Sequence, residues 1–187
     1  MDLGLKKDEV RLAEYTPEWT EEFQKVKKEI CLKTSLGADR IEHIGSTAIL
    51  GMPAKPIIDL LVGIDDLKVL DKQIISGLKE CGFLRLKVER LGEIVFAKFT
   101  DTTYEVKTHF IHMVDYQQDL WKDLTFFRDY LNANETARQQ YLTIKLAYLE
   151  NGSNGINEYT AFKEEFVRGI YNKREQNEDS FQVTPNS

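Results

Sequence analysis

Apolar residues recur at near-helical spacing close to the start of the chain: Trp19, Phe23, Val26, Ile30 and Leu32. Side chains three or four residues apart share one face of an α-helix, and charged residues such as Lys27 and Lys28 fall on the other faces. Proline is favoured in the first turn of a helix, so Thr16 and Pro17 mark the start. The pattern predicts an amphipathic helix over this segment.

A short apolar run spans residues 56–62, after a turn at residues 51–53. Short apolar runs that are bounded by turn residues are typical of buried central strands. After this run, the apolar positions between Leu67 and Leu78 predict an amphipathic helix that follows Asp65 and stops at Gly82.

Three strand-like segments with short connections come next, at residues 83–88, 93–99 and 104–114. Consecutive strands joined by short turns are usually antiparallel neighbours in one sheet. The remaining apolar stripes predict three helices, at residues 117–131, 135–149 and 157–171.

The order of these elements predicts an α+β or mixed-sheet α/β fold, with a β-sheet flanked by helices and a helical C-terminal half. At 187 residues the chain is long enough for one domain with a real core and short for two. We therefore expect a single domain over residues 1–172, followed by a disordered tail at residues 173–187.

Composition narrows the function classes. The net charge is −6 and the pI is near 5.2, which disfavours a broad nucleic-acid surface because such surfaces need clustered Lys and Arg. No apolar run approaches the length of a membrane span, and the first residues lack a secretory pattern, so a cytoplasmic protein is expected. Cys31 and Cys81 are expected to be free structural thiols.

The most informative segment is the Gly45-Ser46-Thr47 turn, followed thirteen positions after Ser46 by Asp59 inside the apolar strand. A strand that ends in Gly-Ser lets backbone N–H groups and a hydroxyl approach a phosphate closely. A carboxylate such as Asp59 is a hard oxygen ligand for Mg²⁺ or Mn²⁺ on that phosphate. Such an acid needs a partner, and Lys55 is near enough in sequence. The alternative is a tight turn and a purely structural carboxylate.

Further motifs strengthen the interpretation: His43-Ile44-Gly45-Ser46-Thr47, Gly51, Lys55-Pro56-Ile57-Ile58-Asp59, His109, His112, Phe127-Arg128-Asp129-Tyr130-Leu131, Lys145, Tyr159 and Lys163. With these residues the chain resembles the GrpB family, which belongs to the nucleotidyltransferase superfamily. The resemblance covers most of the chain from about Tyr15 to Ile170. It implies a nucleotidyltransferase-like mixed sheet flanked by helices.

The resemblance also assigns roles to residues of the motif. Gly45 and Ser46 match the phosphate-contacting turn of the superfamily, and Asp59 matches its first metal-binding acid. Active members carry a second acid two positions later, where both side chains leave the same face of the strand. This chain has Leu61 there, so the usual two-metal clamp lacks a ligand.

Two residues compete to complete the site. His112 is a candidate catalytic base or metal ligand, because neutral imidazole is available near pH 7. Glu105 is a candidate metal ligand, but strand parity places it on the opposite face from His112. For histidines in general, hydrogen bonding in a core or at a surface is the more ordinary role.

The remaining candidates are assigned to binding of the phosphate-bearing ligand: His43, Gly45, Ser46, Thr47, Lys55, Arg128, Lys145 and Lys163. Arg128 is equally suited to a structural pair with a carboxylate, and exposed helix lysines usually have no specific role.

Three functions stay open. The first is a Mg²⁺- or Mn²⁺-dependent transfer of a nucleotidyl group from an NTP to an unknown acceptor hydroxyl. The second is a module that binds a nucleotide, coenzyme or phosphorylated metabolite without transferring anything, which Leu61 favours. The third is a structural or partner-binding protein that uses its helical C-terminal half. We place the enzyme first, with a phosphate-bearing small molecule as its partner and no membrane.

Overall fold

The computed structural model describes residues 2–6, 9, 11–88, 90–151 and 156–182. The chain divides into two compact units, residues 1–124 and residues 125–187. The expected single domain that ends at residue 172 stays a prediction.

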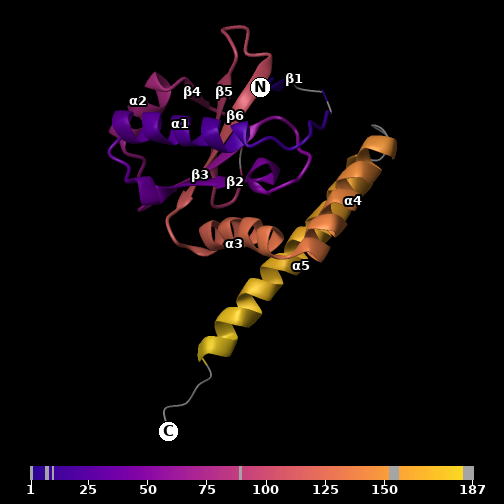
Figure 1. The fold of residues 1–187 in the computed structure, drawn as a ribbon. Coiled ribbons are helices and arrows are strands. Elements are labelled where there is room, and N and C mark those ends of the chain that lie inside the picture. The colour runs from indigo at the N-terminus through magenta and orange to yellow at the C-terminus, as the bar shows by residue number, and fades with distance from the viewer. Residues whose placement is uncertain (1, 7–8, 10, 89, 152–155, 183–187) are drawn as a thin grey trace. The chain divides into compact units, whose positions relative to one another are not determined.

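Unit 1 is built on a mixed sheet of six strands (Figure 1). The strands are β1 (Leu5–Lys6), β2 (Ile41–Ile44), β3 (Ile58–Ile64), β4 (Phe83–Arg85), β5 (Ile94–Phe99) and β6 (Val106–Asp115). The order is β2-β3-β6-β5-β4, with β1 also paired to β6, and only β3 and β6 run parallel. The predicted mixed sheet and the antiparallel β4-β5-β6 series are confirmed.

The helices are α1 (Glu18–Lys33), α2 (Lys72–Glu80), α3 (Asp119–Ala133), α4 (Glu135–Asn151) and α5 (Ile156–Gln182). Two short 3₁₀ turns, η1 (Ala38–Arg40) and η2 (Ser46–Ala48), flank β2. The predicted helix after Asp65 begins later than expected. Asp71 caps α2 by accepting a hydrogen bond from the backbone of Gln73 at 2.7 Å, so the residues before it form a loop.

The C-terminal helix also differs from its prediction. Residues 173–182, expected as disordered tail, continue α5 to Gln182. Their sequence is rich in Glu, Gln, Lys and Arg, which favour helix even where the apolar pattern ends. Residues 183–187 lie outside the described part of the chain.

One face of the sheet carries the main core, because alternate side chains of a strand point to the same side. Ile58, Leu60 and Val62 of β3 are buried there with Trp19 and Phe23 of α1. Leu78 of α2 joins the same cluster, so α1 and α2 cover this face.

The opposite face carries a second apolar cluster, formed by Ile44, Leu61, Val114 and Trp121. Trp121 lies in the first turns of α3, and Tyr116 packs against it edge-on. Asp59 belongs to this face, since it is two residues from Leu61 on β3.

Unit 2 holds an aromatic cluster of its own. Phe127 of α3 packs edge-to-face with Tyr141 of α4 at 5.4 Å and with Phe166 of α5 at 6.4 Å between ring centroids. Tyr141 and Phe166 stack with their rings 14° apart. These contacts join the three helices within the unit.

Candidate functional site

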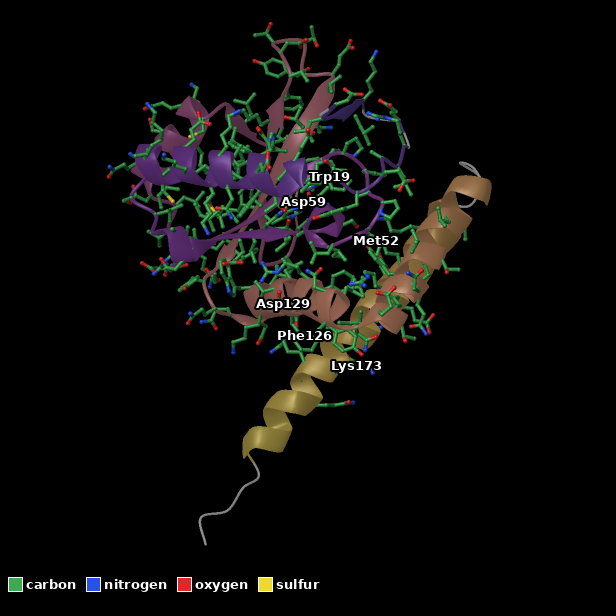
Figure 2. The ribbon with its side chains drawn as sticks, viewed as in Figure 1. Trp19, Met52, Asp59, Phe126, Asp129 and Lys173 are labelled. Carbon is green, nitrogen blue, oxygen red and sulfur yellow. The ribbon has the colours of Figure 1, made fainter. Side chains whose placement is uncertain are left out.

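Asp59 lies near the start of β3, between Ile44 of β2 and Phe110 of β6 in the strand register. Its side chain is 27% exposed, so the carboxylate can reach a ligand from solvent. Figure 2 labels the residue within the sheet of unit 1. Asp59 is the only acid of β3, the central strand predicted from the sequence. It lies on the sheet face opposite α1 and α2.

The turn after β2 lies directly against this carboxylate. Gly45 has φ +71°, a conformation that favours glycine, and a Cβ atom built there would lie 2.3 Å from Asp59 Oδ2. Both the backbone conformation and the space require glycine. Gly45 and Asp59, which are fourteen positions apart in the sequence, therefore lie directly against each other in the fold.

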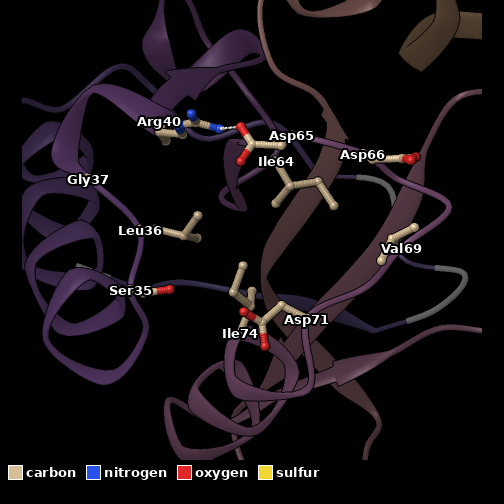
Figure 3. A pocket seen from close by; sticks show the side chains of 10 residues that line it. All are labelled: Ser35, Leu36, Gly37, Arg40, Ile64, Asp65, Asp66, Val69, Asp71 and Ile74. Atoms are coloured by element: carbon tan, nitrogen blue, oxygen red, sulfur yellow. Dashed lines mark hydrogen bonds and ion pairs between the residues drawn. The ribbon is translucent and has the colours of Figure 1, made fainter.

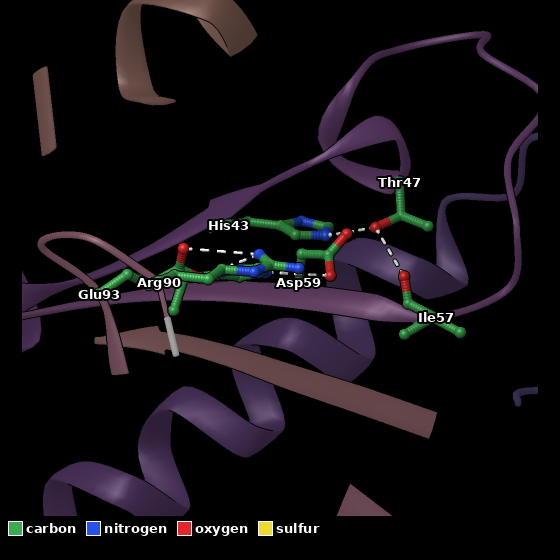
Figure 4. A network of polar contacts seen from close by, with 7 residues as sticks. His43, Thr47, Ile57, Asp59, Arg90 and Glu93 are labelled. Carbon is green, nitrogen blue, oxygen red and sulfur yellow. Dashed lines mark hydrogen bonds and ion pairs between the residues drawn. The ribbon is translucent and has the colours of Figure 1, made fainter. Parts of the chain in front are cut away.

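Ser46 and Thr47 occupy η2 immediately after Gly45. Ser46 is half-buried, and its hydroxyl makes no hydrogen bond within the described residues. The hydroxyl of Thr47 is buried and donates to the carbonyl of Ile57 at 3.4 Å (Figure 4). Of the two hydroxyls, that of Thr47 is used within the fold and that of Ser46 is not, among the described residues.

His43 supports the turn from the other face of the sheet. Its ring stacks on Phe23 of α1 with the centroids 4.7 Å apart, and its Nε2 lies 3.0 Å from Thr47 Oγ1. Because Thr47 donates to Ile57, its oxygen accepts from His43 Nε2–H. The structure brings His43 to Thr47, while Asp59 leaves the opposite face of the sheet.

A line of polar side chains runs from β3 across β6 to the residues just before β5, on the face that carries Asp59. His112 of β6 is the register partner of Leu61 and of Val95. Its Nδ1 hydrogen-bonds Glu93 Oε1, and its Nε2 lies 3.5 Å from Asp59 Oδ1. Arg90 Nη1 lies 3.4 Å from Glu93 Oε1 and completes the line (Figure 4).

The two carboxylates set the charge of His112. Burial alone would lower the pKa of the imidazole, but the hydrogen bonds and charges of Asp59 and Glu93 outweigh burial and raise it to about 9. Burial raises the pKa of the Glu93 carboxyl, but the hydrogen bond and charge of His112, together with Arg90, outweigh burial and lower this pKa. At pH 7 His112 is therefore an imidazolium between the two acidic side chains.

Leu61 occupies the place where a second metal-binding acid is expected. It is fully buried in the cluster with Ile44, Val114 and Trp121. A carboxylate in that position would lose its hydration, at a cost of roughly 2–7 kcal/mol for a buried polar group. Its neighbour on β6, His112, already holds the carboxylates of Asp59 and Glu93. Packing by the start of α3 thus explains the apolar residue.

Glu105 and His112 are not brought together. Glu105 lies just before β6, is 65% exposed, and is 3.8 Å from Lys6 Nζ. Phe110 is the register partner of Asp59, so Glu105 is five residues farther along, about 16 Å at the rise of a strand. As a metal ligand beside Asp59, Glu105 does not fit this arrangement.

The candidate cations divide between the units. Lys55 is exposed in the loop before β3 in unit 1. Arg128 of α3 makes a two-pronged pair with Asp129, at 2.7 and 3.1 Å. Lys145 of α4 is 5% exposed and lies over the ring of Tyr141, so it is not the exposed helix lysine that the sequence suggested. Lys163 is half-buried on α5. Phosphate binding by the three cations of unit 2 stays a prediction.

Glu93 is the site residue that sequence reasoning missed. It was predicted only as the first residue of a strand. Its relation to His112 depends on the β5-β6 register, which the six-residue connection at residues 100–105 does not specify. The sequence shows which residues share a face of one strand, but it does not show which residues of the neighbouring strand lie beside them.

A metal has limited choices at this site. Within the described residues, no group of three His, Cys, Asp or Glu side chains has the arrangement of a metal site. His112 uses opposite ring nitrogens for its two carboxylates, so Asp59 and Glu93 cannot meet at one ion. One Asp does fit Mg²⁺, which commonly binds through one or two carboxylates, substrate phosphates and water.

Comparison with known proteins identifies the family. The family described as GrpB protein matches residues 9–173. The chain belongs to the GrpB family. The glutamate-rich protein GrpB of Alkalihalophilus pseudofirmus is 42% identical over 174 residues, which cover 91% of this chain and 99% of that protein.

A solved structure supports the same fold. The crystal structure of GrpB from Enterococcus faecalis covers 88% of this chain and 99% of its own, with a TM-score of 0.67 at 24% identity. The predicted fold class, a mixed sheet flanked by helices, is confirmed.

This chain is also similar to part of a longer protein. A dephospho-CoA kinase of Mycolicibacterium paratuberculosis is 30% identical over 190 residues, which cover 88% of this chain but only 46% of the kinase. This chain therefore spans less than half of that relative. In the described part of the chain, no helix combines the length and apolar character needed to cross a bilayer.

Proposed function

We propose that this chain binds the phosphates of a nucleoside triphosphate at the turn of Gly45, Ser46 and Thr47. One Mg²⁺ or Mn²⁺ ion would bind between those phosphates and Asp59, and a nucleotidyl group would be transferred to an acceptor hydroxyl. The observation that carries the proposal is the contact between the Asp59 carboxylate and Gly45. It sets a hard oxygen ligand directly beside a turn that a phosphate can approach.

The residues of the turn would act on the donor phosphates. Gly45 leaves the backbone open to close approach, and the Ser46 hydroxyl, without a partner in the described chain, would hydrogen-bond a phosphate oxygen. Lys55 would add positive charge near the entrance of β3. In the transfer, the acceptor oxygen bonds to the α-phosphorus as the bond to the pyrophosphate oxygen breaks, and the hydroxyl proton leaves to solvent.

His112 and Glu93 would position Asp59. With a pKa near 9, His112 is protonated at pH 7, so it is poorly suited to accept a proton as a general base. An imidazolium held by Glu93 instead fixes the Asp59 carboxylate and offsets its charge. The catalytic role first expected for His112 thus becomes a positioning role in this proposal.

The second candidate is a module that binds a nucleotide, coenzyme or phosphorylated metabolite without transferring anything. The burial of Leu61 favours it, because the second carboxylate of a two-metal site has no place. The similarity to a protein named dephospho-CoA kinase adds coenzyme A and dephospho-CoA to the ligands worth testing.

A thermal-shift panel would test the proposal. The purified chain is heated with ATP, GTP, CTP, UTP, coenzyme A, dephospho-CoA and sugar phosphates, each with and without Mg²⁺ or Mn²⁺. A ligand that binds only the folded chain raises its unfolding temperature by mass action. We expect a metal-dependent shift with an NTP that Asp59→Asn abolishes and Glu105→Gln leaves intact, followed by pyrophosphate release in an acceptor screen.

The other outcomes also decide between the candidates. A shift without metal dependence, and without pyrophosphate release from any NTP, would favour the binding module. A metal-dependent shift that Asp59→Asn does not change would place the metal-bound ligand elsewhere and contradict the transferase proposal.

A further inference from the structure

A cavity of about 360 Å³ lies in unit 1, at the end of β3 opposite Asp59. Leu36, Ile64 and Ile74 give it an apolar lining (Figure 3). Ile64 is five residues beyond Asp59 and leaves the other face of the sheet, roughly 16 Å along the strand. The cavity is thus separate from the site proposed above, and its volume is in the range of small-molecule sites.

Three carboxylates stand around the cavity, on Asp65, Asp66 and Asp71. Each uses one oxygen within the protein: Asp65 accepts from Arg40, Asp66 from the backbone of Lys68, and Asp71 from the backbone of Gln73. Among the described residues, the second oxygen of each carboxylate has no partner. Three acceptor oxygens therefore remain for a ligand.

Arg40 does not make the cavity a site for anions. Its Nη1 is 2.6 Å from Asp65 Oδ1, and its guanidinium lies over the ring of Tyr116 at 4.3 Å. The lining still carries two more negative than positive charges. A cationic ligand suits this balance better than a phosphate does.

The carboxylates are divided between opposite rims. In Figure 3, Asp65 and Arg40 lie on one side of the cavity and Asp71 on the other, with Leu36 and Ile64 between them. We propose that the cavity binds a linear diamine or polyamine. One ammonium group pairs with Asp65, another pairs with Asp71, and the methylenes between them pack on the apolar lining.

Other cations fit less well. A hard divalent ion needs several oxygen ligands that converge, and the described residues contain no such group of acidic side chains. A monoamine would pair with only one of the two carboxylates, Asp65 or Asp71. The pairing of an apolar middle with two separated acids distinguishes an alkyl diamine from both.

Calorimetric titration at low ionic strength tests the site, with putrescine, cadaverine, spermidine and butylamine as probes. We expect one diamine length to bind best and butylamine to bind more weakly, because only a diamine reaches both rims. Asp65→Asn and Asp71→Asn should each weaken binding of the best diamine by up to about fivefold, the range for exposed ion pairs. Asparagine keeps the cap of α2, so Asp71→Asn should fold.

Asp101→Asn, an exposed acid in the turn before β6, is the matched control and should leave diamine binding unchanged. Equal weakening by Asp101→Asn would mean general attraction to an acidic protein and would overturn the proposal. Equal binding of butylamine and putrescine would overturn it as well. Asp59→Asn should have no effect, so this result is independent of the nucleotide test.

Discussion

At the scale of single residues, Gly45 meets two demands at once. Its φ of +71° is unfavourable for any residue with a Cβ atom, and that atom would also meet the Asp59 carboxylate. Gly51 has the same φ of +71°, but nothing lies within 4 Å of its Cβ position. Comparing a substitution at Gly45 with one at Gly51 therefore distinguishes the cost of the backbone conformation from the cost of the contact with Asp59.

Gly45→Ala should lower the free energy of unfolding by about 2 kcal/mol or more, from backbone strain and displacement of Asp59. Gly51→Ala should cost only about 1 kcal/mol, the backbone part. Urea unfolding of the two variants measures the difference. Equal losses would show that the Asp59 side chain simply moves aside.

Glu93→Gln should lower the pKa of His112 from about 9 toward 6.5, because the imidazolium loses one of the two charges that favour it. An NMR titration of the His112 ring proton measures the pKa directly. Glu105→Gln is the matched control and should leave it unchanged, since Glu105 pairs with Lys6. An unchanged pKa in Glu93→Gln would remove Glu93 from the polar line.

At the scale of elements, the packing of α2 on the end of α1 depends on Gly77. A Cβ atom at Gly77 would lie 2.1 Å from the backbone oxygen of Lys33. Backbone atoms cannot rotate away as a side chain can. Glycine is therefore required here in the middle of a helix, where it is otherwise unfavourable.

Gly77→Ala should destabilise the protein by about 1–3 kcal/mol through overpacking. Gly169→Ala in α5 is the comparison, because nothing lies within 4 Å of that position. It should stabilise the helix by roughly 0.5–1 kcal/mol. Chemical denaturation gives both signs, and a stabilising effect of Gly77→Ala would contradict the close α1-α2 packing.

Elements with a strong apolar period were predictable from the sequence, while their ends and pairings were not. The helix at residues 18–33 and the buried strand at 58–64 follow from their patterns. The start of α2 was predicted too early because Leu67 and Leu70 also pack on the core, but from a loop. The spacing of apolar residues predicts which side chains are buried, but a buried side chain can also come from a loop.

The same limit applies to the candidate site. Gly45, Ser46 and Asp59 were linked by a motif, and the fold brings them together. Glu93 was missed because its closeness to His112 depends on strand register. His43 was grouped with the ligand-binding residues by its place in the motif, although its side chain leaves the opposite face from Asp59.

At the scale of the whole molecule, two histidines respond to pH in opposite ways. Burial lowers the pKa of His109 to about 4, helped by Lys98 and Lys25 and opposed by Asp59. Its Nε2 has no hydrogen-bond partner among the described residues, with Glu22 Oε1 at 3.6 Å. His112, with its pKa raised to about 9, contributes stability that is fully present below pH 6.5 and is lost as the pH rises through 9.

Stability should therefore fall as the pH drops from 6.5 to 4, because the unfolded chain binds a proton at His109 that the folded chain excludes. The loss from this residue should reach about 3 kcal/mol at most. Urea unfolding at several pH values measures it. His109→Gln, which does not titrate, should show a shallower decline, and an identical decline would assign acid sensitivity to other groups.

The packing of Leu61 and Trp121 in one apolar cluster has a consequence for how this protein can change. Substituting a single acid at position 61 would not create a second ion-binding group, because the new charge would be buried in this apolar cluster beside a histidine that already holds Asp59 and Glu93. Any lineage that gained paired-ion chemistry would first have to lift the opening turns of α3. A change in catalytic chemistry would thus depend on a change in helix docking, two steps that must occur in that order.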